Sequence, residues 1–343
     1  MTHLRTIIDG GFGLDNLTIA EVRTREPGPG EVRLRVEAVS LNRRDLLLVQ
    51  GIYNPRQDLP SVPCSDGAGI ADAVGAGCKR IRKGDRAVLH MMPDWLSGEP
   101  SSAKLSHAYG GACREGTLEQ MIIVPERALL EIPDKMSFEA AATLPCAAIT
   151  AWSAIVTLGH VQPGDCVLIQ GTGGVSLFAL QFAKMNGATI IATTSSPERE
   201  QRLKALGADA TVNYRMDKDW ARTARRLAPE GRLDLIVDVG GGGTLDASLR
   251  VIRPGGTIAL IGVLDGASAT LNLPLAVMRQ VRLQGVTCGS RETFEAMLRA
   301  VTAHGIDPVI DTRYTFATVR QAFERMEANA HVGKIIIAPW AED

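Results

Sequence analysis

Residues 166–184 read CVLIQGTGGVSLFALQFAK and join a short apolar run to a glycine-rich turn and then to apolar residues at helical spacing. Residues 167–169 are apolar without alternation, as expected for a parallel strand that is covered on both faces. Gly171 and Gly173 permit a tight turn and a close backbone approach, so free N–H groups at the start of the next helix can face a pyrophosphate. The predicted contacts of this turn are Gly171, Thr172, Gly173, Gly174 and Val175.

The context of this turn makes the prediction more specific, because a glycine-rich turn alone marks ordinary turns as often as ligand sites. Ser176 replaces the third glycine of the dinucleotide fingerprint and adds only a hydroxymethyl group where helix and strand pack closely. Ser196 and Pro197 suit the start of a following helix, and Gly207 suits its end. Further strands are predicted at 189–193, 210–213, 233–238, 257–261 and 281–286. We therefore expect an α/β fold with a doubly wound parallel Rossmann sheet, the alternative being an α/β domain that binds no nucleotide.

The flanking segments have a different strand pattern. In residues 31–39, apolar Val32, Leu34 and Val36 alternate with charged residues, which indicates a strand with one wet face. Near the C-terminus, 318–329 has a helical pattern and 334–338 is strand-like. We predict a mostly β domain from 1–147, a dinucleotide-binding domain from 148–286, and a return to the first domain from 287–343.

The composition favours small-molecule partners. With 37 basic and 38 acidic residues the net charge is −1, which gives no reason to expect a nucleic-acid or membrane partner. No apolar run approaches the roughly 20 residues of a membrane span, so a cytoplasmic protein is expected. The six cysteines lie far apart and suggest neither a disulfide framework nor a cysteine-only metal site.

The order of motifs resembles the medium-chain dehydrogenase/reductase superfamily over nearly the whole chain, and within it the zinc-independent quinone oxidoreductase-like branch. The matching stretches are PGPGEVRLRVEAVSLNRRDLLLVQG (27–51), PCSDGAGIADAVGAGCKRIRKGDRAV (63–88), REGTLEQMIIVPE (114–126), AATLPCAAITAW (141–152) and HVGKIII (331–337). The resemblance implies a GroES-like barrel beside the Rossmann domain, and a homodimer.

The resemblance also predicts that no metal is bound. Its zinc alcohol dehydrogenases take ligands from positions that correspond here to Asn42, Ser65 and Cys146, with Asp66 at the position of an adjacent acid. A catalytic zinc needs three good protein donors, and a thiolate with an amide and a hydroxyl is too weak a set.

The residues after the second predicted Rossmann strand favour NADPH (NADP+) over NADH. An NAD site places an acid about 20 residues past the glycines, whereas this chain has Thr194, Ser195 and Ser196 there, followed by Arg199, which suits a 2′-phosphate. The alternative is that the serines cap a helix and the arginine lies on a solvated face. By resemblance Tyr214 flanks the adenosine phosphate, unless it is an ordinary surface tyrosine.

Other cofactor positions come from the resemblance alone. It places Gly289 and Ser290 near the nicotinamide, although this segment can equally be a crossover turn between domains. Gly262 and Lys334, the latter in HVGKIII, complete the predicted cofactor set.

Three residues are candidates for catalysis. Asn42 is expected to hydrogen-bond the acceptor or the nicotinamide ribose, or else to stabilise a turn. Thr150 lies near the nicotinamide by resemblance, or merely in a helix start, and Tyr53 supplies a proton or hydrogen bond, or lies in a surface turn. Asp45 is expected to orient neighbouring groups.

The expected activity is hydride transfer from NADPH to a quinone or an α,β-unsaturated carbonyl, since such acceptors need no metal to polarise them. The alternatives are a zinc-dependent alcohol dehydrogenase with atypical ligands and an NADPH-binding protein without catalysis.

Overall fold

The chain divides into two compact units in the computed structural model, which describes residues 1–111 and 113–340. Unit 1 consists of Met1–Ala147 and Gly289–Asp343, and unit 2 consists of Ala148–Cys288. Ala112 and residues 341–343 fall in the first and third predicted segments and lie outside the described residues.

Unit 2 is built on a six-stranded parallel sheet of order β10-β9-β8-β11-β12-β13. The strands are β8 (Cys166–Gln170), β9 (Thr189–Thr194), β10 (Ala210–Asn213), β11 (Leu235–Asp238), β12 (Thr257–Leu260) and β13 (Arg282–Gly285). All six correspond to the runs predicted from the sequence, with ends that differ by at most two residues. The Rossmann prediction is therefore confirmed.

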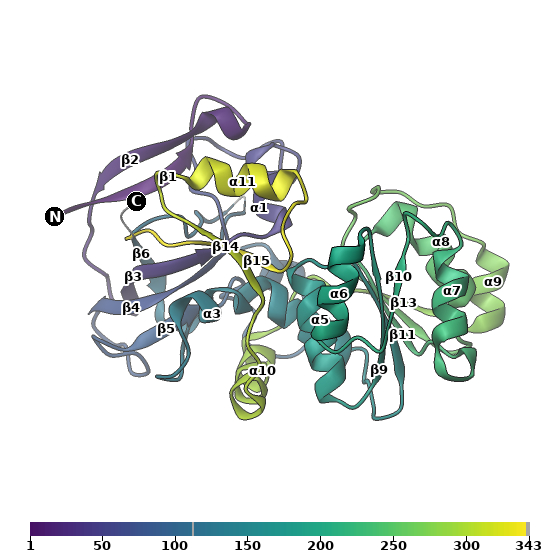
Figure 1. Cartoon of the computed structure of the whole chain (residues 1–343). Coiled ribbons are helices and arrows are strands. Elements are labelled where there is room, and N and C mark those ends of the chain that lie inside the picture. The colour runs from purple at the N-terminus through teal and green to yellow at the C-terminus, as the bar shows by residue number, and fades with distance from the viewer. Residues whose placement is uncertain (112, 341–343) are drawn as a thin grey trace. The chain divides into compact units, whose positions relative to one another are not determined.

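Helices cover both faces of this sheet, as Figure 1 shows, with α5 and α6 on one side and α7, α8 and α9 on the other. They are α5 (Gly174–Met185), α6 (Pro197–Ala205), α7 (Trp220–Leu227), α8 (Leu245–Val251) and α9 (Leu273–Arg279), preceded by the short α4 (Ile149–Trp152). Helix α6 begins as predicted, because the Ser196 side chain accepts the Arg199 N–H and Pro197 is its first residue. It ends just before Gly207, whose φ is +105°.

Because helices cover both faces of the sheet, its central strands contain continuous apolar runs. Residues Val167, Leu168 and Ile169 of β8 are all fully buried, and Leu168 belongs to the core beneath α7 and α8. Strand β8 therefore sits in the middle of the sheet with no wet face, which is the reason its sequence does not alternate.

Unit 1 contains a seven-stranded sheet of order β14-β15-β3-β4-β5-β7, with β6 paired to β3, and a separate hairpin of β1 and β2. The strands are β1 (Thr2–Ile8), β2 (Leu17–Arg23), β3 (Glu31–Ser40), β4 (Asp66–Val74), β5 (Arg86–Leu89), β6 (Met121–Pro125), β7 (Leu129–Glu131), β14 (Ile310–Tyr314) and β15 (Lys334–Ile337). All pairs are antiparallel except β14 with β15. The predicted mostly β domain is thus confirmed.

The helices of unit 1 are few and come from both ends of the chain. They are α1 (Arg43–Val49), α2 (Ser102–Leu105), α3 (Phe138–Ala142), α10 (Arg291–His304) and α11 (Val319–Glu327). Strand β15 pairs with the end of β3, where Ile336 is opposite Ser40 and Ile337 is opposite Val39. The C-terminal segment is therefore part of the same sheet as the N-terminal strands, and this pairing brings Lys334 close to the start of α1.

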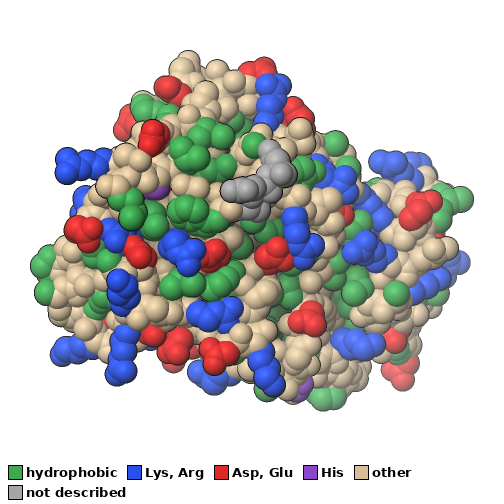
Figure 2. Space-filling model, turned by 60° about the vertical axis from the view of Figure 1, so that its left-hand side comes forward, with side chains coloured by type: hydrophobic (Ala, Val, Ile, Leu, Met, Phe, Trp, Pro, Cys, Tyr) green, Lys and Arg blue, Asp and Glu red, His purple; other side chains and the backbone are tan. Residues whose placement is uncertain are grey.

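Charged side chains of both signs are interspersed on the face shown in Figure 2. That mixture accords with the net charge of −1. On this face, basic residues do not gather into the continuous stripe that a nucleic-acid surface presents.

Candidate functional site

The strand order of unit 2 locates a ligand crevice. The chain runs outward from β8 to β9 and β10, and then crosses to β11 on the other side of β8. In open α/β sheets, ligands bind outside the carboxyl ends of the strands where the order reverses. The carboxyl ends of β8 and β11 are therefore the place to examine.

The turn between β8 and α5 has the geometry that a pyrophosphate needs. Gly171 has φ +77° and donates its N–H to Thr193 O at 2.9 Å, which holds the turn against β9. Gly173 precedes the first residue of α5, and a Cβ built on it would meet nothing within 4 Å. The first N–H groups of a helix have no carbonyl partner within it, so those of Gly174 and Val175 can receive an anion.

Ser176, which replaces the third glycine of the fingerprint, is compatible with close packing of α5 on β8. Its side chain is buried, and Oγ donates to Gln170 O at 2.7 Å at the end of β8. The hydroxyl thus bonds back to the strand, and the helix still packs closely on the sheet.

The residues predicted to hold the adenosine end lie together at the carboxyl ends of β9 and β10. Thr194 is opposite Asn213 in the sheet, and the N–H of Tyr214 donates to Thr194 O at 3.0 Å. Arg199 Nη1 donates to Ser195 Oγ at 3.5 Å, and Tyr214 is 40% exposed. The sequence predicted these positions from separate motifs, and the structure brings them to one place.

Two observations in unit 2 fit a bound dinucleotide. The space above Gly173 is open, and Thr194 Oγ1 is buried without a hydrogen-bond partner among the described residues. Ser196 Oγ accepts a hydrogen bond from the Arg199 N–H at 3.4 Å and so caps α6, as the helix-cap alternative predicts. This cap does not prevent the neighbouring Ser195 from contacting a phosphate.

A buried polar network beneath the crevice was missed by the sequence analysis. Asp238, the last residue of β11, accepts hydrogen bonds from Gly241 N at 2.9 Å, Thr244 Oγ1 at 2.7 Å and Ser248 Oγ at 2.7 Å. Gln170 Nε2 donates to Asp238 Oδ2 at 3.1 Å. The Gln170 Oε1 accepts from the N–H groups of residues 239 and 240. The network therefore fixes the glycine-rich turn after β11 against the end of β8.

Two other predicted residues of unit 2 have structural roles. Gly262 approaches the backbone so closely that an added Cβ would lie 2.4 Å from Val239 O. Thr150 is buried in α4, and Oγ1 donates to Thr287 O at 3.3 Å. A π-helical turn, Ser153–Thr157, follows α4, and such turns are frequent at functional sites.

Asn42 occupies a tightly held position at the start of α1. Its N–H donates to Asp45 Oδ2 at 2.8 Å, which is the orienting contact expected of Asp45. Its side-chain Oδ1 accepts a hydrogen bond from Lys334 Nζ at 2.6 Å. Burial raises the pKa of the Asp45 carboxyl to about 6, although the adjacent Arg44 guanidinium opposes the rise.

Tyr53 lies in the turn that follows α1 and is 50% exposed. The Arg44 guanidinium lies 5.0 Å from the centroid of its ring, within cation–π range. The exposed ring is thus held by Arg44 of α1, and the catalytic role of its hydroxyl stays a prediction.

The zinc-ligand positions of the resembling enzymes contain groups that are used within the protein. Ser65 Oγ donates to Asp66 Oδ1 at 3.0 Å, and Lys334 Nζ lies 4.0 Å from Asp66 Oδ2. Burial raises the pKa of Asp66, and the Lys334 ammonium opposes that rise. A lysine ammonium competes with a metal ion for the same oxygens, so this donor set does not fit zinc.

The described residues hold no other arrangement suited to a metal: among residues 1–111 and 113–340, no three His, Cys, Asp or Glu side chains come together as ligands would. Nor, in the part of the chain that the structure describes, is any helix long and apolar enough to cross a membrane.

The remaining predicted cofactor residues lie in unit 1. Ser290 caps α10, with Oγ 3.1 Å from the Thr293 N–H, which gives this serine a structural role directly after Gly289. Lys334 is buried, and its ammonium donates to Leu41 O and Asn42 Oδ1, both at 2.6 Å. Their contact with a cofactor stays a prediction.

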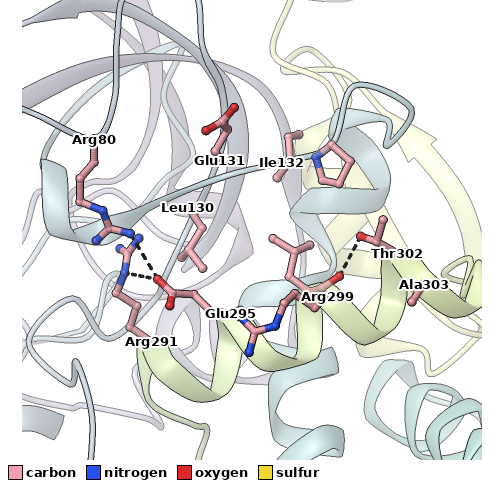
Figure 3. Close-up of a pocket in the computed structure, with 11 residues that line it drawn as sticks. Arg80, Leu130, Glu131, Ile132, Arg291, Glu295, Arg299, Thr302 and Ala303 are labelled. Carbon is pink, nitrogen blue, oxygen red and sulfur yellow. Dashed lines mark hydrogen bonds and ion pairs between the residues drawn. The ribbon is translucent and has the colours of Figure 1, made fainter.

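A surface pocket of about 580 Å³ lies elsewhere in unit 1, between α10 and the end of β7. Figure 3 shows Arg80 and Arg291 both directed at Glu295, with Arg299 further along the helix. The pocket contains none of the predicted site residues, and of the two carboxylates that line it, Glu295 is already paired with the guanidinium groups of Arg80 and Arg291.

Comparison with known proteins bears on both units. Residues 28–134 match the profile of the alcohol dehydrogenase GroES-like domain, and residues 174–303 match that of the zinc-binding dehydrogenases.

Similar proteins extend the match over nearly the whole chain. The zinc-type alcohol dehydrogenase-like protein C1773.06c of Schizosaccharomyces pombe is 37% identical over 95% of this chain and 96% of its own. The acryloyl-coenzyme A reductase of Sulfurisphaera tokodaii is 26% identical over 94% and 96%, respectively. The solved structure of an NAD-dependent alcohol dehydrogenase has a TM-score of 0.89 and 32% identity, covering 98% of this chain and 99% of that one.

Proposed function

Because this chain belongs to the medium-chain dehydrogenase/reductase superfamily of oxidoreductases, we propose that it is a zinc-independent reductase that uses NADPH. Its acceptor is an activated double bond, either a quinone or an α,β-unsaturated carbonyl. The proposal rests on the side chains at the positions where related enzymes bind zinc. Here Asn42 accepts a hydrogen bond from Lys334, and Ser65 donates one to Asp66.

The chemistry follows from that observation. A simple alcohol or carbonyl gains much from a Lewis acid that polarises it, whereas an electron-poor enone or quinone needs less help and accepts hydride when hydrogen bonds stabilise the charge that develops on its oxygen. NADPH, when bound, supplies the hydride. The chain's own contribution is to bind the cofactor at the α5 N-terminus. The acryloyl-coenzyme A reductase among the relatives acts, by its name, on such an alkene.

The choice of NADPH is supported by the cluster at the ends of β9 and β10. Thr194, Ser195 and Ser196 supply hydroxyl groups, Arg199 supplies a cation, and β9 ends without a carboxylate. A 2′-phosphate dianion is favoured by that combination, whereas the ribose hydroxyls of NADH are best held by an acid.

The acceptor and the metal are tested together. We expect the purified protein to contain no stoichiometric zinc and to oxidise NADPH with members of a panel of quinones and enones, with no loss of rate after chelation. Stoichiometric zinc and inactivation by a chelator would instead establish the alcohol dehydrogenase alternative. NADPH binding without turnover across the panel would favour the non-catalytic one.

The cofactor is tested by comparing Arg199→Ala with Lys204→Ala, an exposed cation further along α6. Loss of one charge-assisted contact should raise the Kd for NADPH about tenfold in Arg199→Ala, with little change for NADH. Lys204→Ala should leave both affinities unchanged. Equal affinities for the two cofactors in the native protein would contradict the NADPH assignment.

We further propose that the active protein is a homodimer formed through β13. This strand is one of the two edges of the parallel sheet, so its outer N–H and C=O groups have no partner strand in the described chain. The apolar side chains of Leu273, Val277, Met278 and Leu283 on α9 and β13 are between 43% and 81% exposed. A second copy can bury them and pair the edge in one symmetric interface.

A further inference from the structure

Gln170 connects the end of β8 to the turn that follows β11. It is the last residue of β8, directly before the glycine-rich turn, and is only 4% exposed. Nε2 donates to Asp238 Oδ2 and to Ser248 Oγ, both at 3.1 Å. Oε1 accepts from the N–H groups of Val239 and Gly240, at 3.3 and 3.4 Å. A carboxamide carries both donors and an acceptor, so this one side chain satisfies buried groups of each kind.

The two residues that Gln170 holds are also bonded to the segment after β12. Val239 O accepts from the Leu264 N–H at 3.2 Å, and Gly240 O accepts from the Asp265 N–H at 2.8 Å. Hydrogen bonds therefore connect the carboxyl ends of β8, β11 and β12 within unit 2.

These three strand ends lie where the second half of a dinucleotide would extend. The predicted adenosine contacts lie at the ends of β9 and β10, and the pyrophosphate is expected at the turn after β8. A dinucleotide binds across the crevice, with one nucleoside on each side of its pyrophosphate. In the sheet order β10-β9-β8-β11-β12-β13, the half beyond the pyrophosphate therefore extends over β11 and β12.

We propose that Gln170 is a positioning residue for the half of the dinucleotide that lies beyond the pyrophosphate. The inference rests on the proposed function, which gives unit 2 a bound NADPH. By holding the backbone of Val239 and Gly240, the carboxamide fixes the wall of the crevice that follows β11 and β12. Gln170 acts on the cofactor through this backbone, since its own donors and acceptor are engaged inside the protein.

Two ligands separate this role from other roles of a buried glutamine. NADPH occupies both halves of the crevice, whereas adenosine 2′,5′-bisphosphate has only the adenosine end and one phosphate at its 5′ position. A positioning contact on the β11 side affects the Kd for NADPH alone. Support of the glycine-rich turn would affect the Kd values of both ligands, and a role in stability alone would affect neither.

The variant is Gln170→Met, which has a side chain of similar size but lacks the hydrogen bonds of the carboxamide. We expect calorimetric titration to show a Kd for NADPH about tenfold higher than in the native protein, as for the loss of one or two buried hydrogen bonds. The Kd for the bisphosphate should stay within about twofold of its native value. Equal rises for the two ligands would overturn the proposal, and so would an unchanged Kd for NADPH.

Asp234→Asn is a matched control, because Asp234 connects the same two strands at their amino ends. Its Oδ2 accepts from the Cys166 N–H at 2.9 Å, and its carboxylate pairs with Arg232 and Arg253. Loss of these ion pairs should lower the melting temperature, as Gln170→Met should, but leave both Kd values unchanged. A higher Kd for NADPH in Asp234→Asn would attribute the effect to general destabilisation and overturn the proposal.

Hydrogen exchange tests the native protein and so does not depend on either variant folding. NADPH should slow exchange of the N–H groups in residues 239–243 and 262–266, because a ligand against this wall suppresses its local opening. The bisphosphate should not slow it. Unchanged exchange in saturating NADPH would overturn the proposal.

Failure of the proposed function gives a different result. If the native protein binds NADPH but reduces no acceptor, the proposed function fails, while the Kd and exchange data still decide the role of Gln170. If it prefers NADH, the same comparison uses NADH and AMP. A native protein that binds neither dinucleotide would overturn both.

Discussion

Replacing Gly173 by alanine should weaken NADPH binding without weakening the fold. The residue has φ −75° and ψ 174°, a conformation that alanine adopts freely, and the added Cβ would meet nothing within 4 Å. Alanine also restricts the unfolded chain more than glycine does. We therefore expect the free energy of unfolding to stay the same or to rise by about 0.4–1 kcal/mol.

The expected loss of affinity follows from the same open space. If the pyrophosphate lies over the N-terminus of α5, the new methyl group keeps its oxygens from the N–H groups beside Gly173. Losing one charge-assisted hydrogen bond costs about 1.5–3 kcal/mol. The Kd for NADPH should therefore rise about 10- to 100-fold, so binding and stability change in opposite directions.

Titration of NADPH by fluorescence and unfolding in urea measure the two quantities on the same preparations. Lys204→Ala, at an exposed position of α6, is a control that should alter neither quantity appreciably. An unchanged Kd in folded Gly173→Ala would show that the pyrophosphate does not lie at this turn. A fold destabilised by more than about 1 kcal/mol, against the expectation for a compatible backbone, would show that the space is not open.

Three further predictions concern other parts of the molecule. Asp238→Ala leaves several buried donors without an acceptor, so urea unfolding should show a loss of about 3 kcal/mol; a loss too small to measure would argue against the network. The Asp45 carboxyl has a pKa of about 6 in the folded protein, against 3.8 in model compounds. As the pH rises from about 4 to about 6, the unfolded chain therefore loses this proton first, and the free energy of unfolding should fall. The fall should be smaller in Asp45→Asn, and equal pH profiles for the two proteins would refute the raised pKa. Met278→Asp should convert the proposed homodimer to monomers in light scattering, whereas an unaltered dimer mass would place the interface elsewhere.

The six strands of unit 2 could be predicted because each is buried on both faces and therefore appears as a compact apolar run. Strand β14 was missed because it is only five residues long and none of them is fully buried, so it forms no apolar run. Helix α10 was also missed, although its sequence carried a signal: Phe294, Met297, Leu298 and Val301 have helical spacing and are buried, after a capping Ser290.

The glycine-rich turn and the cluster at the ends of β9 and β10 could be predicted as candidate cofactor contacts because their motifs are local. The network around Asp238 joins residues 68 positions apart through side chains, and no periodicity signals such a contact. The bond between Lys334 and Asn42 spans 292 positions. Resemblance suggested that both residues belong to a site, but only the three-dimensional pairing of β15 with β3 shows that one holds the other.

The place of β15 between β3 and β14 has a consequence for biosynthesis. Unit 2 ends at Cys288, whereas β15 begins at Lys334, so at roughly 5–20 residues per second the ribosome releases all of unit 2 seconds before that strand. Until then, Val39 and Ser40 lack the partners they have in the finished sheet. A stalled or truncated nascent chain would expose this strand edge while unit 2 is already complete, and unpaired edges recruit other chains. Loss of the last strand should therefore produce aggregation during synthesis, not a shorter enzyme.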